Sequence, residues 1–372
     1  MRKHAALRIG LSLLVASCAP TYAEGYQAAF EQGLRAKNAG RWEEAATSFD
    51  KAAALGDRYK DRDEARMLYA EALERMERFD DAEAAYRKVE TESGGRYHGQ
   101  RAAFALGRLV WEQRGFEEGA AETLRAVRAY PSSGLVRHAV KRLLGHVEEN
   151  DGPEAALEWL APIEKELHDT EAGEAVTYEY ATLLARCNRK EDSMKALLTL
   201  ARAHPYPHGS LTDDAFYVAS LWLEDLGRPK EAVAVLEEMI QPFEAAYLGS
   251  SYRRPRWPQG AFRIAVLWRD KLNDRARAKR EFWRVYDEHF TARQTDDALW
   301  EVARMERDDK NDDEACRALR VLKEKKPDSR YNNCLHLLCP ALERGPRGCS
   351  RMIVEDLGLD PDREWDDRPV KD

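Results

Sequence analysis

Long hydrophobic runs are scarce in this chain of 372 residues. The apolar stretch near the N-terminus extends only from Ile9 to Ala16, which is too short to span a bilayer. No β-rich segment interrupts the sequence. With 44% apolar and 34% charged residues, the composition indicates an all-helical protein with one elongated, well-solvated core rather than a compact globule.

Catalytic and nucleotide-binding motifs are also missing. The sequence has no HExxH zinc motif, no GxSxG nucleophile, no GxxxxGK phosphate loop and no dinucleotide glycine fingerprint. Paired carboxylates are common, but on helix faces a solvated surface is their default role. Some periplasmic muramidases carry helical solenoids beside a lysozyme-like domain, but the short segment after the last expected helix cannot hold such a domain. We therefore expect no enzymatic activity and no cofactor.

The chain lacks an excess of positive charge. Its formal net charge is −8, and removing the three cations of the leader, Arg2, Lys3 and Arg8, leaves −11. This balance argues against nucleic acid as a main partner.

A helical hairpin is the unit that the sequence does contain, and its clearest copy runs from Thr295 to Pro327. Thr295 or Asp296 is expected to cap a first helix. The DDKND segment turns the chain, and a second helix carries Ala315, Leu319 and Leu322 on one face before the proline stops it.

The same hairpin recurs along the chain, with a small residue in each second helix where two helices must approach closely. Successive copies lie 36 to 39 residues apart, except for one step of 46. These small residues are Ala45, Ala82, Gly119, Ala155, Ser193, Ala232, Ala278 and Ala315. One hairpin cannot bury its apolar stripe alone, so the copies are expected to stack.

This pattern resembles the tetratricopeptide repeat. In the first copy, the residues that match the family pattern are Gly33, Gly40, Ala45, Phe49 and Ala52, and three later copies end in Pro131, Pro205 and Pro327. The resemblance implies an all-α fold, a right-handed α-solenoid of about eight repeats plus a capping helix over residues 26–342. Copies four and seven depart from the pattern in the turn.

The N-terminus has the features of an export signal. A basic start and a short apolar run lead to Val15-Ala16-Ser17-Cys18, which looks like a bacterial lipobox in which Cys18 is lipidated. This reading makes residues 1–17 a signal peptide and 18–25 a linker. Ala19 after the cysteine suggests the outer membrane by resemblance to Gram-negative lipoproteins. Ordinary secretory cleavage after Thr21-Tyr22-Ala23, giving a soluble periplasmic protein, is the alternative.

Four of the six cysteines, Cys316, Cys334, Cys339 and Cys349, fall near the C-terminus. In an exported protein this clustering predicts two disulfides, with three possible pairings, while Cys187 stays reduced. A metal site around Cys334-Leu-His336-Leu-Leu-Cys339 is the alternative, although its spacing matches no common zinc pattern. Residues 343–372 are expected to form a cysteine-containing cap and a solvated acidic tail.

Two sets of residues are candidates for partner contact. The first is an exposed loop within the longest step, with Arg253, Arg254, Arg256 and Trp257, although its tryptophan can instead pack on its own repeat. The second follows from the resemblance, since one position of each first helix faces the binding groove of the family. The residues at that position are Phe30, Met67, Phe104, Tyr178, Tyr217 and Trp300. They suit an amphipathic helix or extended peptide, unless each ring only fills the gap between neighbouring helices.

Together these features resemble bacterial outer-membrane tetratricopeptide lipoproteins that help to assemble β-barrels, secretins or envelope-spanning machines. We therefore expect a lipid-anchored scaffold that binds envelope proteins or peptides. The alternatives are a periplasmic cell-wall accessory that coordinates peptidoglycan enzymes or binds wall fragments, and a scaffold of a motility or secretion complex.

Overall fold

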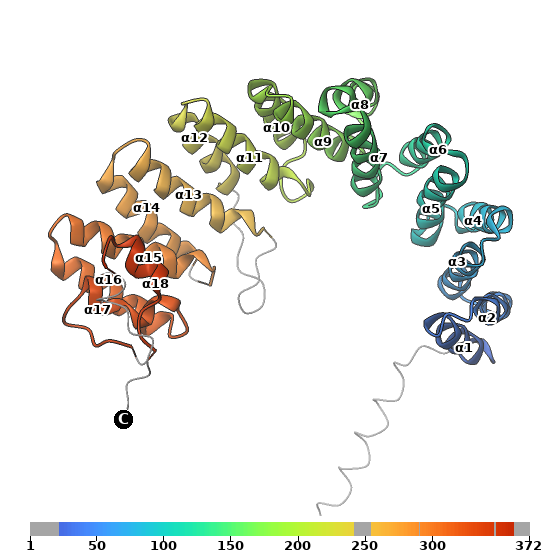
Figure 1. The fold of residues 1–372 in the computed structure, drawn as a ribbon, viewed down its shortest axis with the longest axis horizontal. Coiled ribbons are helices and arrows are strands. Elements are labelled where there is room, and N and C mark those ends of the chain that lie inside the picture. The colour runs from blue at the N-terminus through green and yellow to red at the C-terminus, as the bar shows by residue number, and fades with distance from the viewer. Residues whose placement is uncertain (1–21, 242–253, 290, 346, 361–372) are drawn as a thin grey trace, which may run out of the picture. The chain divides into compact units, whose positions relative to one another are not determined.

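The computed structural model describes residues 22–241, 254–289, 291–345 and 347–360, and every regular element in these ranges is helical (Figure 1). The expected all-α fold of helical hairpins is thereby confirmed. The hairpin helices are α1 (Tyr26–Asn38), α2 (Trp42–Leu55), α3 (Tyr59–Arg75), α4 (Phe79–Ser93), α5 (Tyr97–Arg114), α6 (Phe116–Ala129), α7 (Val136–Asp151), α8 (Pro153–Leu167), α9 (Gly173–Arg186), α10 (Lys190–Ala203), α11 (Thr212–Asp225), α12 (Pro229–Ile240), α13 (Arg256–Asp270), α14 (Arg275–Glu288), α15 (Gln294–Asp308) and α16 (Asp312–Lys325). A cap follows, with the 3₁₀ helix η1 (Arg330–Asn333), α17 (Leu335–Leu338) and α18 (Arg351–Asp356).

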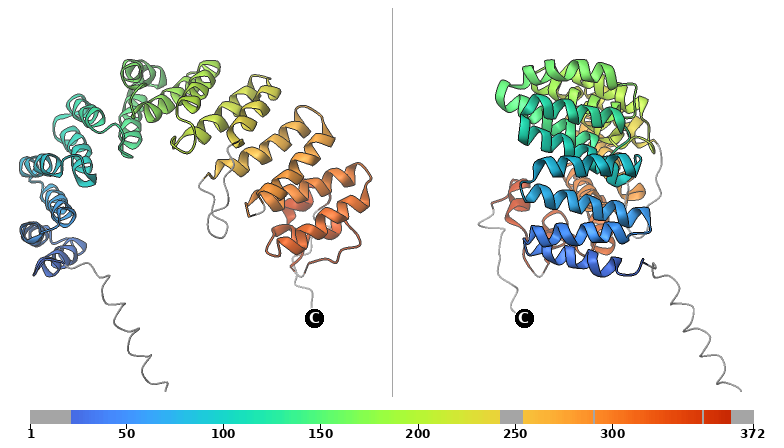
Figure 2. Two further views of the ribbon diagram at one scale, coloured as in Figure 1. Left: turned by 180° about the vertical axis from the view of Figure 1, so that it is seen from behind. Right: turned by 90° about the vertical axis from the view of Figure 1, so that its right-hand side faces the viewer.

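The chain divides into two compact units. The N-terminal unit comprises the described residues up to 152 together with 165–176, and the C-terminal unit comprises 153–164 together with the described residues from 177 onward. In the N-terminal unit, α1 to α6 pack in chain order, each on the next. In the C-terminal unit, α10 to α16 pack in the same way, and α17 packs on α15 and α16. Figure 2 shows these consecutive helices side by side.

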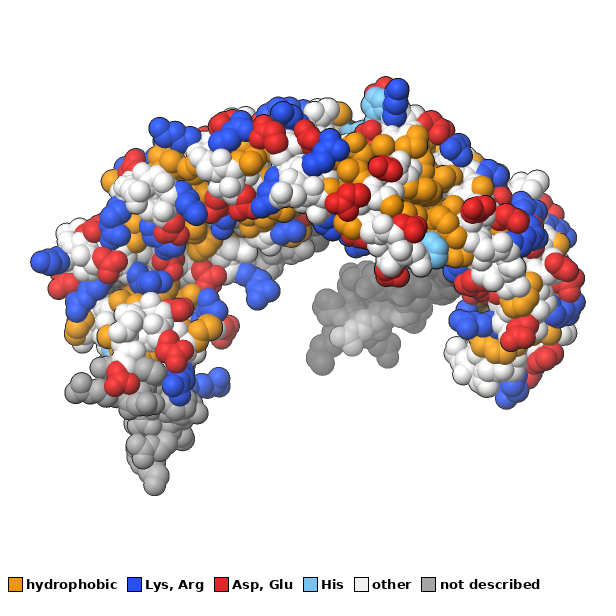
Figure 3. All heavy atoms as spheres, turned by 45° about the horizontal axis from the view of Figure 1, so that its top comes forward, with side chains coloured by type: hydrophobic (Ala, Val, Ile, Leu, Met, Phe, Trp, Pro, Cys, Tyr) orange, Lys and Arg blue, Asp and Glu red, His pale blue; other side chains and the backbone are white. Residues whose placement is uncertain are grey.

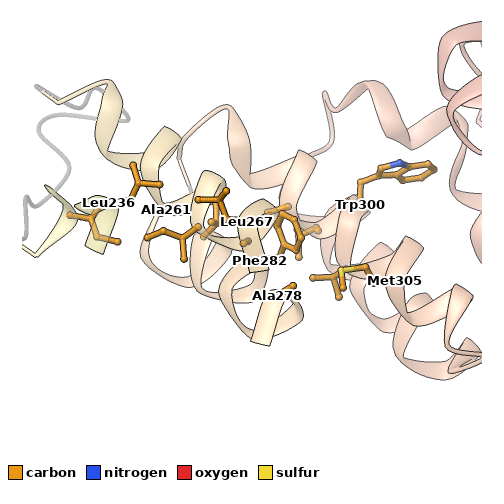
Figure 4. Close-up of a cluster of buried hydrophobic side chains, with 14 of the residues drawn as sticks. Leu236, Ala261, Leu267, Ala278, Phe282, Trp300 and Met305 are labelled. Atoms are coloured by element: carbon orange, nitrogen blue, oxygen red, sulfur yellow. The ribbon is translucent and has the colours of Figure 1, made fainter. Parts of the chain in front are cut away.

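Each unit has its own apolar core. In the C-terminal unit one cluster of buried side chains continues from α10 through α15 into the cap, where Ile353 and Val354 of α18 join it. Figure 4 shows part of this cluster, with Phe282 of α14 placed between side chains of α13 and α15. No helix in the described ranges has both the length and the apolar character that crossing a membrane would need.

The small residue of each second helix occupies the fourth helical position, where it is buried. At Gly119, helices α5 and α6 approach so closely that an added methyl group would lie 2.2 Å from the Cβ atom of Trp111. The structure corrects the position in copy four, where Ala156 is fully buried and Ala155 is partly exposed. With Ala156 in place, the first five small residues are spaced by 37 residues at every step.

Each hairpin turn contains one residue with a positive φ. Four of these residues are glycine and two are asparagine, which adopt this conformation at little cost, but one is glutamate and one is lysine. In chain order they are Gly40, Glu77, Gly115, Gly152, Asn188, Gly227, Asn273 and Lys310.

Thr295 does not cap its helix, contrary to the expectation from the sequence. Helix α15 begins one residue earlier, and the Thr295 hydroxyl donates to the carbonyl oxygen of His289, at the end of α14, over 2.6 Å. Thr212 makes the equivalent bond to the carbonyl of His204 after α10. A hydroxyl at this position links the start of one copy to the end of the preceding copy, because it donates to a carbonyl oxygen that has no partner within its own helix.

The acidic pair after each of these threonines binds the element that follows the hairpin, which is the cap for copy eight and the next copy for copy six. Asp296 accepts a hydrogen bond from the Ser329 hydroxyl at 2.7 Å, and Asp297 accepts from Arg330 at 2.9 Å. In copy six, Asp213 pairs with Arg254 and Asp214 with Arg256. The repeated Thr-Asp-Asp-Ala sequence is therefore a link between each of these hairpins and its neighbouring elements.

Candidate functional site

A groove of about 730 Å³ lies in the N-terminal unit. Most of its lining comes from the first helices of copies two to four, and we call it the α3–α5–α7 groove. The lining residues are Lys37, Trp42, Met67, Glu71, Glu74, Arg75, Tyr86, Arg101, Phe104, Ala105, Arg108, Glu112, Leu135, His138 and Arg142.

Helical periodicity explains why these residues share one surface. On α3, Met67, Glu71 and Glu74 are spaced i, i+4 and i+7. At α7, Leu135 and Arg142 are also seven residues apart. Side chains at these intervals lie on the same face of a helix, so each first helix presents one stripe to the groove.

The floor of the groove is apolar. Met67 and Phe104 retain only 3% and 8% of their exposure, and Tyr86 is fully buried. Met67 and Tyr86 also belong to one core cluster of the unit. These side chains therefore hold the helices together while they form the bottom of the groove.

Of the six side chains proposed for a binding stripe, the α3–α5–α7 groove brings together Met67 and Phe104. Phe30 is not part of its lining and packs edge-on against Phe49. Tyr178 and Tyr217 lie partly buried against the core of the other unit. Trp300, which is 3% exposed, stacks on Tyr331 in that unit, with ring centroids 4.6 Å apart. Partner binding by the stripe stays a prediction.

Charged residues line the walls and join successive copies. Glu71 of α3 lies between two cations, with Lys37 Nζ of α1 at 3.0 Å and an Arg101 nitrogen of α5 at 2.9 Å. These pairs link three first helices. At partly exposed positions each contributes about 0–1 kcal/mol, so their main effect is to orient the side chains.

Glu74 is held more firmly. Arg108 donates to both of its carboxylate oxygens, the closest approach being 2.6 Å, and the Tyr86 hydroxyl donates to it over 2.9 Å. Burial alone would raise the pKa of this carboxyl, but the hydrogen bond and charge of Arg108 hold its pKa below the usual value. Arg108 also pairs with Glu112 at 3.0 Å.

Two groove cations, Arg75 and Arg142, form no ion pair among the described residues, but Arg75 is exposed and Arg142 is not. Arg142 is half-buried, and its Nε atom is enclosed without a hydrogen-bond acceptor. Its guanidinium lies over the Trp111 ring, 5.5 Å from the ring centroid. Burial lowers the pKa of Arg142, and the positive charge of Arg108 lowers it further. The groove thus contains five cations against three carboxylates, in a chain whose net charge is −8.

Sequence reasoning missed Arg142 and its surroundings. The signal that was available is a spacing of 34 residues, shorter than the repeat, that relates Glu74, Arg108 and Arg142. At the first interval Glu74 pairs with Arg108. At the second interval Arg108 and Arg142 are both cations.

The proposed contact loop is largely internal, which corrects the expectation of an exposed basic and aromatic segment. Arg254 is 4% exposed and bonds Asp213 through two nitrogens at 2.7 and 2.8 Å. Trp257 is 1% exposed, and its indole nitrogen donates to the carbonyl of Ile240 at 2.9 Å. Arg256 is partly exposed and pairs with Asp214 at 2.6 Å. The acids of copy six and the end of α12 bury these side chains, and Arg253 lies outside the described residues.

The cysteines confirm the prediction of two disulfides. Cys316 is bonded to Cys339 and Cys334 to Cys349, which selects one of the three possible pairings. Cys187 belongs to neither bond. Because both flanking cysteines are oxidised, the alternative of a metal site around His336 is wrong. Cys18 lies outside the described residues.

Comparison with known proteins identifies the hairpin. Residues 30–97 and 75–134 match the sequence profile of the tetratricopeptide repeat. A structure of pilF from Pseudomonas aeruginosa is 18% identical, with 63% of this chain and 95% of that chain covered and a TM-score of 0.37. The C-terminal part of a tetratricopeptide repeat-containing protein from Cytophaga hutchinsonii is 12% identical, with 73% and 99% covered and a TM-score of 0.40. No curated protein matches this chain by sequence.

Proposed function

Because residues 30–134 match the tetratricopeptide repeat profile and the later hairpins repeat the same helical unit, we propose that the chain is a protein-interaction scaffold that holds a segment of its partner in the α3–α5–α7 groove. Tetratricopeptide repeats bind proteins in general, and the matching profile belongs to no catalytic family. The observation that supports this groove is the combination of an apolar floor with an excess of cations in an acidic chain.

The groove suits an amphipathic helix or an extended peptide. Apolar side chains of the ligand would lie over Phe104 and Leu135, while its acidic side chains would meet the cations of the walls. Hot spots of protein interfaces are enriched in arginine and aromatic residues, and both surround this floor.

A blocking variant tests the groove. Peptides selected from a displayed random library on the wild-type protein are expected to lose binding to Ala105→Trp, because Ala105 lines the groove and is partly exposed. The matched control is Ala121→Trp on the exposed surface of α6, which should bind the peptides unchanged. Melting temperatures of both variants show whether they fold. If the folded Ala105→Trp protein keeps all its ligands, the groove is not the site.

The cellular setting that we propose is the periplasmic face of the bacterial outer membrane, with the protein anchored by lipid at Cys18. Its support is the lipobox-like Val15-Ala16-Ser17-Cys18 sequence. In this setting the partners are envelope proteins under assembly, such as β-barrels or secretins. Crosslinking in cells followed by affinity purification should recover such a partner. Recovery of peptidoglycan enzymes, or binding to purified peptidoglycan, would instead indicate a cell-wall accessory.

A further inference from the structure

We propose that Arg142 anchors an acidic side chain within the segment that the groove binds. This inference rests on the proposed function, since it names the chemistry of the ligand at one position of the same groove. It starts from a contrast along the 34-residue line. Arg108 pairs with Glu74, which lies 34 residues before it, whereas the residue 34 positions before Arg142 is another cation, Arg108.

The neighbouring contacts define what Arg142 lacks. Arg108 is neutralised by Glu74 on one side and by Glu112 on its own helix. Glu112 also attracts Arg142, but no ion pair or hydrogen bond joins them in the described structure. A half-buried guanidinium without an acceptor carries a desolvation cost, and an incoming carboxylate would remove that cost by supplying a charge-assisted hydrogen bond.

The guanidinium is also held in place before any ligand arrives. It lies over Trp111, and the indole contacts Phe116 and His146 edge-on, with ring centroids 5.3 and 5.0 Å away. The backbone and Cβ atom of Trp111 pack directly against Gly119 of α6, where any side chain would clash with them. An arginine over a fixed aromatic ring loses little conformational entropy when it binds an anion.

The groove favours an acidic side chain over a terminal carboxylate. No asparagine or glutamine is present in its lining, so no side-chain amide helps to enclose the end of a chain. Leu135, the N-cap residue of α7, lies seven residues before Arg142, and Phe104 lies four residues before Arg108 on α5. An aspartate or glutamate flanked by apolar residues fits this arrangement.

The experiment is a peptide selection combined with a double-mutant cycle. A random library of internally fused peptides, which have no free C-terminus, is selected on the wild-type protein and on Arg142→Gln. The wild type should enrich one aspartate or glutamate beside apolar residues, and Arg142→Gln should lose that preference. Lys141→Gln, at an exposed position on the same helix, is the matched control and should keep it.

Binding measurements with a synthetic version of the selected peptide, amidated at its C-terminus, show how much the acidic residue contributes to affinity. Replacing its aspartate by asparagine, or its glutamate by glutamine, should weaken binding to the wild type roughly tenfold and binding to Arg142→Gln less than about twofold. Groove-dependent peptides without an acidic preference, or a preference that survives in Arg142→Gln, would overturn the anchor and leave the proposed function standing. A version with a free C-terminal carboxylate that binds when the amidated version does not would also overturn it, in favour of a terminal carboxylate. A selection without any groove-dependent peptide would overturn both proposals.

Discussion

Glu77 and Lys310 are the two turn residues whose side chains conflict with their backbone. Their φ values are 58° and 64°, in the left-handed region, where a residue with a Cβ atom is disfavoured by about 1–2 kcal/mol. Glycine occupies the equivalent position in four other copies. The chain therefore stores a small amount of strain in copies two and eight.

Replacing these residues should relieve that strain. Glu77→Gly and Lys310→Gly are each expected to raise the free energy of unfolding by roughly 0.5–1 kcal/mol, because the relief of strain exceeds the stability that is lost through glycine's greater entropy in the unfolded chain. Urea denaturation measures the change. Gly40→Ala, at a φ of 70°, is the control and should destabilise by a similar amount. No gain in either variant would mean that the turns are not strained.

His289 is a buried residue that links stability to pH. It is fully buried with its ring edge-on to Trp257, at 4.3 Å between centroids. Burial lowers its pKa to about 4; the charge of Glu288 opposes this shift and that of Arg284 adds to it. Because the unfolded chain binds the proton below a pKa of about 6.5, stability is constant above that pH and falls as the pH drops toward 4.

The expected loss between pH 7 and pH 5 is about 2 kcal/mol from this residue alone. Urea denaturation at the two pH values measures it, with His289→Phe as the variant that cannot take up the proton. The difference between wild type and variant isolates His289 from the carboxylates that also titrate. Equal losses in both proteins would show that His289 does not carry this effect.

At the scale of helices, the C-terminal cap depends on covalent bonds as well as packing. The Cys316–Cys339 bond joins α16 to the residue after α17, and the Cys334–Cys349 bond joins the end of η1 to the segment before α18. These cap elements are short, so their own helical stability is small. Within the described residues the cap takes the place of a further hairpin after α16, and the disulfides restrain the chain there.

Replacing Cys316 and Cys339 together by serine should lower the free energy of unfolding of this end by about 2–4 kcal/mol. Because each repeat contacts mainly its neighbours, hydrogen exchange should accelerate from α15 to α18 and remain unchanged from α1 to α6. Treatment of the wild-type protein with a reductant should give the same pattern. Uniform acceleration over the whole chain would contradict this local role.

At the scale of the whole molecule, many charged side chains of the described residues lie beside a side chain of opposite charge. In Figure 3, Lys and Arg side chains are interspersed with Asp and Glu side chains over the face that is shown. Many of these residues form ion pairs between neighbouring helices, such as Arg125 with Glu90 and Arg202 with Glu238. This surface gives little long-range attraction to a polyanion, in agreement with a protein partner.

Attachment to a membrane is predicted to depend on one residue, Cys18. Cys18→Ala should release the protein from the membrane fraction or block its maturation, because lipid chains supply about 0.8 kcal/mol for each buried methylene. Fractionation and mass spectrometry of the mature N-terminus measure this. An unmodified N-terminus at Glu24 in the wild type would favour ordinary secretory cleavage and contradict the lipid anchor.

The sequence by itself determined the helices, the hairpin repeat and the clustering of the cysteines. Helical periodicity, prolines and small residues are local signals, and they are read along the chain without knowledge of its neighbours. The position of the small residue in copy four was wrong by one, which corresponds to about 100° around a helix. The burial of Ala156 in the structure shows which alanine occupies that position.

Tertiary structure decided the contacts between residues that are far apart in the sequence. It selected the disulfide pairing and buried Arg254 and Trp257 instead of exposing them. It also placed Arg142 near Arg108 without an ion pair to an acid in the described residues. The physical reason is that such contacts depend on how neighbouring helices cross and shift along one another. The pairs Lys37–Glu71 and Glu74–Arg108 are consequently 34 residues apart, while the repeat is 37. This difference of nearly one helical turn cannot be derived from the spacing of the repeats.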